Sequence, residues 1–311
     1  MPRDNFATIM PTAPAQSDLF AFVTPAELET LVTLARREDM GPDARDLTSE
    51  LFIPATLTGR ALFRARKPGQ LAGVAIIPTV ARLYDPRLTT HPLLTDGSAL
   101  HADQALAEVA GPLRSLLAME RVALNFLTHL SGIASLTARY RAATAGTRAV
   151  ICDTRKTIPG LRQLAKYAVV CGGGVSHRLG LYDAVLIKDN HLAHLGLPDL
   201  AQAVQQAVAR ARVLQPAPKF VQVEVDTLAQ LERVLPVQPD MVLLDNMTPD
   251  LLRQAVALRD RVAPNVQLEA SGGVNLDTVR DIARTGVDRI SIGALTHSAP
   301  ALDIGLDVLH A

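Results

Sequence analysis

The residues best suited to chemistry in this sequence lie between Asp153 and His191. Basic side chains outnumber acidic ones there, whereas the whole chain is neutral, with 31 basic and 31 acidic side chains. This local excess of positive charge beside a triple glycine, residues 172–174, indicates a pocket for a small polyanion. A nucleic-acid groove is less consistent with the pattern, because such a groove spreads its positive charge over a whole face of the domain. A solvated loop is the alternative. The basic residues are Arg155, Lys156, Arg162, Lys166, His177, Arg178 and Lys188.

Six short apolar runs, each ending in a charged or small polar residue, follow Gly146. Helical segments separate most of them, and strands that alternate with helices form a parallel sheet with right-handed crossovers. In a (β/α) barrel, functional residues lie at the carboxyl ends of the strands. We therefore predict a barrel with its site at that edge. The runs are residues 149–155, 184–190, 220–226, 241–246, 266–273 and 289–294, and their polar ends are Arg155, Lys188, Glu224, Asp245, Ser271 and Gly293.

The predicted edge combines cations with two carboxylates, Glu224 and Asp245, and with two glycine-containing turns, residues 271–273 and 292–294. Backbone amides in such turns hold phosphate in many barrels. A strand-end Arg binds carboxylate or phosphate through its planar fork, and paired carboxylates hold sugar hydroxyls or Mg²⁺. The edge therefore predicts a phosphosugar ligand with a second, carboxylated partner.

The chain before the barrel pattern predicts a smaller α+β domain without a catalytic signature of its own. Thr24 caps a helix expected to run to about Arg37, and strand, helix and turn signals follow between residues 59 and 110. Residues 38–48 are rich in acids, but they lack regular metal-ligand spacing and are predicted to form a solvated loop.

A long helical region is predicted from Pro112 to about Gly146, with Gly132 as a break between two helices. Arg121 lies there, beside Glu120, in a mostly apolar context. Its charge belongs either to a solvated stripe or to an interface, and the residues alone favour the stripe.

Composition excludes several classes of protein. No window approaches the roughly 18 apolar residues of a transmembrane helix, and residues 1–17, a predicted loose tail, lack a signal peptide's apolar region. Cys152 and Cys171 show no paired spacing, so neither zinc nor a disulfide is expected. We expect a cytoplasmic protein that binds neither nucleic acid nor membrane.

At the polar strand ends the chain resembles the quinolinate phosphoribosyltransferase family, also called nicotinate-nucleotide pyrophosphorylase (carboxylating). The resemblance extends over about 190 residues in family order. Three positions depart from the residues frequent in the family: Ile158, Val170 and Ser176. The matching segments are ERVALNFLTHLSGIA (120–134), DTRKTIPGLR (153–162), KYAVVCGGGVSHR (166–178), DAVLIKDNH (183–191), VEVDTL (223–228), LLDN (243–246), LEASGGV (268–274) and GALTHSAPALDIGL (293–306).

The resemblance implies a Mg²⁺-dependent reaction in de novo NAD biosynthesis. Quinolinate and 5-phosphoribosyl 1-pyrophosphate would give nicotinate mononucleotide, pyrophosphate and CO₂. It also implies an α/β fold in which an incomplete (β/α) barrel, residues 129–297, follows an N-terminal α+β open-sandwich domain, residues 18–128. Residues 298–311 would return to that first domain.

The resemblance further implies a homodimer in which Arg121 enters the partner's active site, a role that reverses the expectation from its surroundings. Lys188, Glu224 and Asp245 would be catalytic, with the two carboxylates serving the metal directly or through water or ribose hydroxyls. The implied substrate-binding residues are Arg121, Thr154, Arg155, Lys156, His177, Arg178, Lys188, Glu224, Asp245, Ser271, Gly272, Gly273, Ile292, Gly293, Ala294 and His297.

Three other functions remain open from the residues. A related phosphoribosyltransferase would act on another base such as nicotinate, without releasing CO₂. An aldolase would use Lys188 as a Schiff-base amine, which needs apolar neighbours. A non-catalytic ligand sensor would have no need to keep Lys188, Glu224 and Asp245 together. His129 and His191 are expected to be structural, whereas His297 stands next to the last strand end.

Overall fold

The computed structural model describes residues 18–193 and 196–309, so the predicted tail, residues 1–17, lies outside the described residues. The chain divides into two compact units. The first comprises residues up to 138, residues 158–173 and residues from 298 onward; the second comprises residues 139–157 and 174–297. This division assigns residues 129–138 and 158–173 to the first unit, although the sequence analysis placed them in the barrel.

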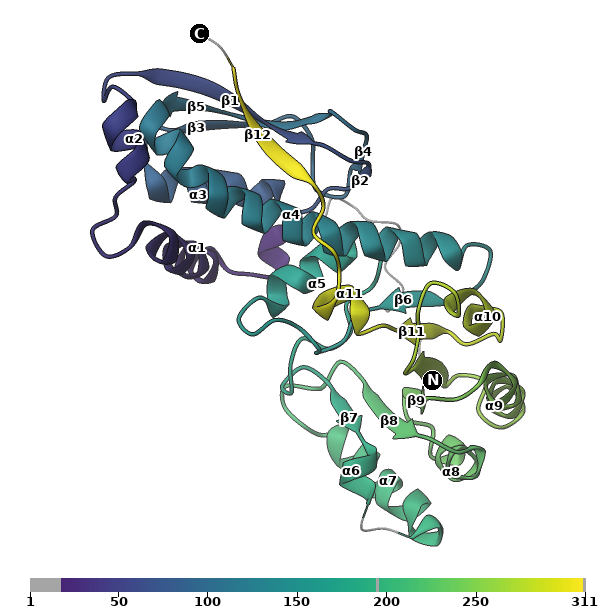
Figure 1. Ribbon diagram of the computed structural model, residues 1–311. Coiled ribbons are helices and arrows are strands. Elements are labelled where there is room, and N and C mark those ends of the chain that lie inside the picture. Colours follow the sequence, from purple (N-terminus) through teal and green to yellow (C-terminus); the bar gives the residue numbers. More distant parts are fainter. Residues whose placement is uncertain (1–17, 194–195, 310–311) are drawn as a thin grey trace. The chain divides into compact units, whose positions relative to one another are not determined.

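The first unit is built on a four-stranded antiparallel sheet with the order β12-β1-β5-β3. The last strand of the chain lies beside β1, with Leu306 opposite Phe63, as the yellow and dark blue strands in Figure 1 show. The strands are β1 (Thr58–Ala65), β3 (Thr89–Pro92), β5 (Ala105–Pro112) and β12 (Ile304–Leu309), and β2 (Gly69–Gln70) pairs with β4 (Ala99–Leu100).

Two helices of this unit, α1 and α2, begin at a side-chain cap. Thr24 accepts a hydrogen bond from the amide of Glu27 at 3.2 Å, and the Glu27 carboxylate accepts one from the Thr24 amide at 2.8 Å, which starts α1 as predicted. The short helix α2 was not predicted. It begins at Leu47, inside the segment expected to be a solvated loop, and Asp46 caps it. The helices are α1 (Pro25–Met40), α2 (Leu47–Phe52), α3 (Ile77–Tyr84), α4 (Leu113–Ala143) and α5 (Arg162–Cys171).

The predicted break at Gly132 is wrong, because α4 continues through that residue to Ala143. A β-carbon at Gly132 would lie 2.2 Å from the carbonyl oxygen of Pro300. The glycine therefore allows another part of the backbone to approach the helix, and the i→i−4 hydrogen bonds continue past it. A sequence pattern alone does not distinguish these two uses of a helical glycine.

The second unit contains the predicted six-stranded parallel sheet, and its strands have the order β6-β11-β10-β9-β8-β7. β6 and β7 are successive strands of the sheet in the chain but form its two edges, so the barrel stays open between them (Figure 1). The predicted α/β fold is confirmed. The strands are β6 (Val150–Cys152), β7 (Val185–Ile187), β8 (Val221–Val225), β9 (Met241–Asp245), β10 (Gln267–Ser271) and β11 (Arg289–Ser291).

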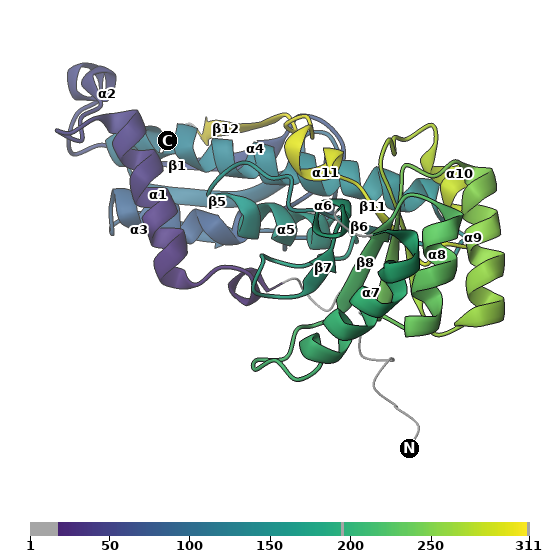
Figure 2. The ribbon, with the colours of Figure 1, turned by 90° about the horizontal axis from the view of Figure 1, so that it is seen from below.

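Helices cover one side of this sheet and pack on one another in chain order, α7 on α8, α8 on α9 and α9 on α10 (Figures 1 and 2). Helices α7 to α10 lie between the apolar runs, where the sequence predicts helical segments. Among the described residues, no helix is long and apolar enough to span a membrane. The helices are α6 (Asp189–Leu192), α7 (Leu197–Ala211), α8 (Leu228–Val234), α9 (Pro249–Val262), α10 (Val279–Ala283) and α11 (Ala294–His297).

The strand register places polar side chains in two layers. Asp245, Ser271, Ser291 and Cys152 are aligned across β9, β10, β11 and β6. Two residues earlier, Leu243, Glu269 and Arg289 are aligned on β9, β10 and β11, and Glu224 of β8 is level with Leu243. Because side chains alternate between the faces of a strand, residues two apart share a face. Both layers therefore project to the same side of the sheet.

Candidate functional site

A cavity of about 550 Å³ lies at the carboxyl edge of the parallel sheet, and all of its lining residues belong to the second unit. Every predicted site residue lines it except Arg121, which is exposed on α4. The other two basic residues between Asp153 and His191 are Arg162 and Lys166. They lie on α5 in the first unit and do not line the cavity. The lining residues that the sequence analysis missed are Asp153, Leu186, Leu243, Asn246, Glu269, Val274 and Ser291.

Two arginines in this cavity repel each other. Burial lowers the pKa of Arg178, the nearby charge of Arg155 lowers it further, and Glu224 partly opposes them. Arg178 donates to the carbonyl of Ala184 at 3.3 Å, and Nε of Arg155 is buried without a hydrogen-bond partner among the described residues. An anionic ligand would relieve this repulsion and supply the missing acceptor.

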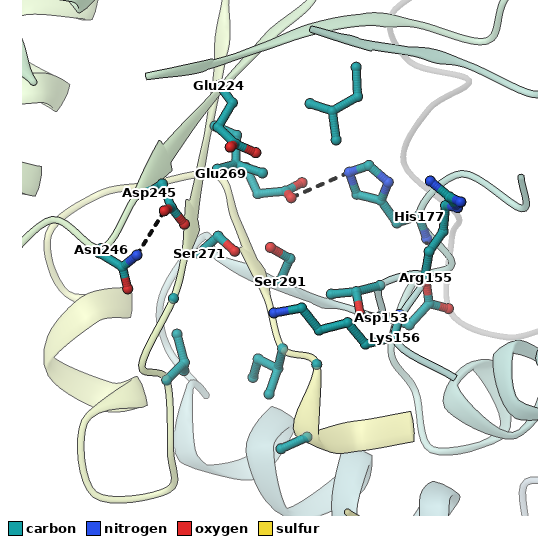
Figure 3. Close-up of a pocket in the computed structure, with 18 of the residues that line it drawn as sticks. Asp153, Arg155, Lys156, His177, Glu224, Asp245, Asn246, Glu269, Ser271 and Ser291 are labelled. Carbon is teal, nitrogen blue, oxygen red and sulfur yellow. Dashed lines mark hydrogen bonds and ion pairs between the residues drawn. The ribbon is translucent and has the colours of Figure 1, made fainter. Parts of the chain in front are cut away.

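The Lys188 amine lies 3.3 Å from the Glu224 carboxylate, and its side chain is 45% exposed. Such a lysine is neither dry nor surrounded by apolar groups, so the Schiff-base alternative lacks the environment that it needs. Strand β9, which pairs with the Glu224 strand β8, ends with Asp245. The Asp245 carboxylate accepts a hydrogen bond from the Asn246 side chain at 2.7 Å (Figure 3). Both carboxylates therefore lie on the side of the cavity formed by β8 and β9.

The turn after β10 requires glycine. Gly272 has φ +92°, and a β-carbon there would lie 2.1 Å from the Asn246 side-chain oxygen. The amides of Gly272, Gly273 and Gly293 donate to no acceptor in the part of the chain that the structure describes. A strand end with unused N–H groups is suited to an anionic oxygen, and the neighbouring Lys156 adds a positive charge.

A buried polar layer underlies the cavity. The Arg178 amide donates to Nδ1 of His177 at 2.8 Å, while Nε2 of His177 lies 2.9 Å from the Gln222 side-chain oxygen and 3.3 Å from the Glu269 carboxylate (Figure 3). Because Nδ1 accepts the Arg178 amide, Nε2 is the ring nitrogen that faces Gln222 and Glu269. The predicted part of His177 in binding the ligand stays a prediction, and its ring lines the cavity.

Glu269 is completely buried and also accepts a hydrogen bond from Arg289 at 3.0 Å. Burial raises the pKa of Glu269, but His177 and Arg289 outweigh that effect and lower the pKa to about 2. The sequence contained a signal for this layer, since Gln222 and Glu269 each stand two residues before a predicted polar strand end, and Arg289 begins the last apolar run. A polar residue inside an apolar run thus marks this layer, whereas the strand ends mark the cavity.

The other three histidines considered in the sequence analysis, His129, His191 and His297, have different surroundings. Nδ1 of His191 accepts a hydrogen bond from the Lys188 amide at 2.9 Å, so this ring orders the backbone next to the lysine. His129 lies on α4, where burial lowers its pKa. His297 lines the cavity beside Gly293.

Comparison with known proteins gives this geometry a family. Residues 133–307 match the family model described as "Quinolinate phosphoribosyl transferase, C-terminal domain", and residues 46–131 match the model of the N-terminal domain. The chain belongs to the quinolinate phosphoribosyl transferase family.

Relatives within this family resemble the chain over most of its length. The nicotinate-nucleotide pyrophosphorylase [carboxylating] of Mycobacterium leprae is 44% identical over 269 residues, which cover 85% of this chain and 91% of that protein. The solved structure of the nicotinate-nucleotide pyrophosphorylase from Francisella tularensis superposes with a TM-score of 0.84 at 34% identity, covering 92% of this chain and 98% of that one. Both chains of a compared pair are thus matched nearly in full.

A more distant structure bears on the alternative substrate. Human nicotinic acid phosphoribosyltransferase superposes with a TM-score of 0.57 at 14% identity, covering 93% of this chain and 74% of that one. A likeness at that identity shows a shared fold alone. The quinolinate phosphoribosyl transferase family is therefore the relationship that informs the substrate.

The buried layer predicts a pH-dependent stability. Replacing Glu269 with Gln should lower the free energy of unfolding near pH 7 by about 3 kcal/mol, because the carboxylate's pKa is lowered from 4.5 to about 2 by its partners. That contribution is complete above the unfolded value of 4.5 and disappears as the pH falls through about 2. The difference between the two proteins should therefore shrink in acid, as measured by urea unfolding across this range.

The matched control is Glu232→Gln, which changes an exposed carboxylate on α8. It should leave the free energy of unfolding nearly unchanged at every pH. A loss at Glu269 that stays constant from neutral pH to acid would contradict an ionised, stabilised carboxylate.

Proposed function

We propose that this cavity is where the chain carries out its quinolinate phosphoribosyltransferase reaction of NAD biosynthesis. Quinolinate and 5-phosphoribosyl 1-pyrophosphate would react there to give nicotinate mononucleotide, pyrophosphate and CO₂. The observation that carries the proposal is the composition of a single cavity: mutually repelling arginines, two carboxylates on adjacent strands and two glycine turns with unused amides.

The arginines suit quinolinate, which carries two adjacent carboxylates. Arg155 and Arg178 present delocalised charges whose repulsion a dianion would remove, and Lys188 adds a third charge at the end of β7. His177 accepts the Arg178 amide through Nδ1 and so positions the backbone of that arginine. Thr154 and Lys156 belong to the same loop and would contact the ligands from β6.

The residues at the carboxyl ends of β8, β9, β10 and β11 suit the phosphosugar. Glu224 and Asp245 would face the ribose hydroxyls, and the turns containing Ser271, Gly272 and Gly273 and containing Ile292, Gly293 and Ala294 would bind its phosphate, with His297 beside them. As pyrophosphate departs, the ribose acquires oxocarbenium character, which nearby carboxylates stabilise electrostatically.

The donor set fits Mg²⁺ held largely by the substrate. Among residues 18–193 and 196–309 no group of three or more His, Cys, Asp or Glu side chains forms a ready metal cage. Mg²⁺ is commonly bound through one or two carboxylates together with substrate phosphates, and Glu224 and Asp245 supply two. When bound, the ion would neutralise the charge of the leaving pyrophosphate.

Positioning completes the reaction without a covalent nucleophile. Once ribose joins the ring nitrogen, the cationic ring stabilises the electron pair that stays on the ring carbon as the adjacent carboxylate leaves as CO₂, and a proton from water then takes the place of the carboxylate. The residues that hold quinolinate thus align the nitrogen with the ribose carbon and keep the carboxylate beside it. Nicotinate lacks that second carboxylate, so CO₂ release separates this function from the nicotinate alternative.

The direct test is an omission assay on the purified protein. Quinolinate, 5-phosphoribosyl 1-pyrophosphate and Mg²⁺ together should yield equal amounts of CO₂ and pyrophosphate, and omission of any one component should abolish both. Turnover of nicotinate with no CO₂ from quinolinate would establish the alternative substrate instead.

The carboxylates have a distinct expected signature. Glu224→Gln and Asp245→Asn should each lower kcat and alter the dependence of the rate on Mg²⁺, because both groups would serve the phosphosugar side. Binding of quinolinate to the free enzyme, measured by calorimetry, should be retained. The opposite pattern, lost quinolinate binding with an unchanged Mg²⁺ dependence, would assign them to quinolinate.

We also propose a homodimer in which Arg121 completes the partner's site, since this arginine is exposed on α4 and does not line its own chain's cavity. Arg121→Ala and Lys188→Ala proteins should each be nearly inactive. Co-expression with random assembly gives about one half heterodimers, each with one intact site, so about a quarter of wild-type activity should return.

If Arg121 served its own chain, each heterodimer site would lack one group and mixing would restore nothing. Differently tagged chains allow the heterodimer to be isolated and its activity measured per dimer. Full activity in the Arg121→Ala homodimer would show that its charge is merely solvated.

A further inference from the structure

Among the buried serine and threonine hydroxyls of the described residues, one differs from the others. Seven serine and threonine side chains are buried, and six of them donate a hydrogen bond to a protein oxygen. Ser291 is 4% exposed, and its Oγ has no hydrogen-bond partner among residues 18–193 and 196–309. A buried hydroxyl left without a partner costs about 1–3 kcal/mol. Its retention at this position is therefore a cost that the fold itself does not explain.

The place of Ser291 in the sheet explains where a partner would come from. It is the last residue of β11, level with Ser271 of β10, which is in turn level with Asp245 of β9. Ser291 lines the cavity, and Figure 3 shows its hydroxyl on the cavity side between Ser271 and Lys156. The unpartnered oxygen is thus at the wall of the site rather than deep in the core.

The neighbours of Ser291 belong to one half of the cavity. Gly293 follows it by two residues, in a turn with an unused amide, and Lys156 packs against that glycine. The Lys156 carbonyl accepts a hydrogen bond from Thr296 at 2.7 Å, which ties this loop to α11. Ser291 therefore lies among the groups assigned above to the phosphosugar.

We propose that the Ser291 hydroxyl binds the phosphoribosyl group of 5-phosphoribosyl 1-pyrophosphate, through a ribose hydroxyl or a phosphate oxygen. The inference rests on the proposed function and adds a binding residue to it. A serine hydroxyl suits this ligand because it both donates and accepts a hydrogen bond, as a sugar hydroxyl also does. The ligand would satisfy a group that the folded protein leaves unsatisfied.

The test is Ser291→Ala, which removes only the oxygen. The KM for 5-phosphoribosyl 1-pyrophosphate should rise about 5- to 10-fold, the equivalent of one neutral hydrogen bond, while the KM for quinolinate should stay within about twofold. Calorimetric titration with ribose 5-phosphate should show a similar loss of affinity without turnover. Thermal unfolding of the ligand-free protein should show an unchanged or higher Tm, because no protein hydrogen bond is lost.

Thr285→Val is the matched control, since its buried hydroxyl donates to the Ile282 carbonyl at 2.7 Å and does not line the cavity. It should lower Tm and leave both KM values unchanged. The opposite responses of the two variants separate a ligand-binding hydroxyl from a structural one.

Several outcomes would overturn the inference. A Ser291→Ala protein with unchanged KM values and unchanged ribose 5-phosphate affinity would show that the hydroxyl has no ligand. A rise confined to the KM for quinolinate would place it at the other substrate, and a fall in Tm like that of Thr285→Val would make it structural. Absence of turnover in the wild-type protein would instead refute the proposed function, and ribose 5-phosphate binding would still decide the role of Ser291.

Discussion

The ion pair of Glu269 and Arg289 underlies the rest of the site. Both side chains are buried, on neighbouring strands at the same level of the sheet, and the pair neutralises charge that would otherwise be costly in the interior. The second oxygen of Glu269 lies against Nε2 of His177, whose opposite nitrogen receives the Arg178 amide. A chain of contacts thus extends from the buried ion pair to the backbone of a ligand-facing arginine.

The polar groups of the site form two layers that differ in their hydrogen-bond partners. In the buried layer, the side chains of Glu269, Arg289 and His177 contact one another, whereas one Glu269 oxygen and the Gln222 amide nitrogen have no hydrogen-bond partner among the described residues. The layer at the strand ends retains unused capacity: Nε of Arg155, Oγ of Ser291 and the amides of Gly272, Gly273 and Gly293 lack protein partners in the described part of the chain. A buried, ion-paired support beneath groups with unused hydrogen-bonding capacity suits a binding site, because little reorganisation is needed when the ligand arrives.

The glycines illustrate how closely backbone and function are linked. At Gly132 the missing side chain admits the backbone of Pro300, whereas at Gly272 it admits the side chain of Asn246, which in turn donates to Asp245. The first use concerns packing, and the second orders a carboxylate of the site. The same residue type thus has different roles, which depend on what approaches it.

Much of this protein follows from the order of its residues. Apolar runs with polar ends determined the six parallel strands, since a buried strand must be apolar and its last residue reaches the edge, and family motifs in order identified the chemistry. The sequence could not assign the contact of His177 with Glu269, the buried pair of Glu269 and Arg289, or the unsatisfied hydroxyl of Ser291. Each depends on partners from strands far apart in the chain, so only the register between strands decides which donor meets which acceptor.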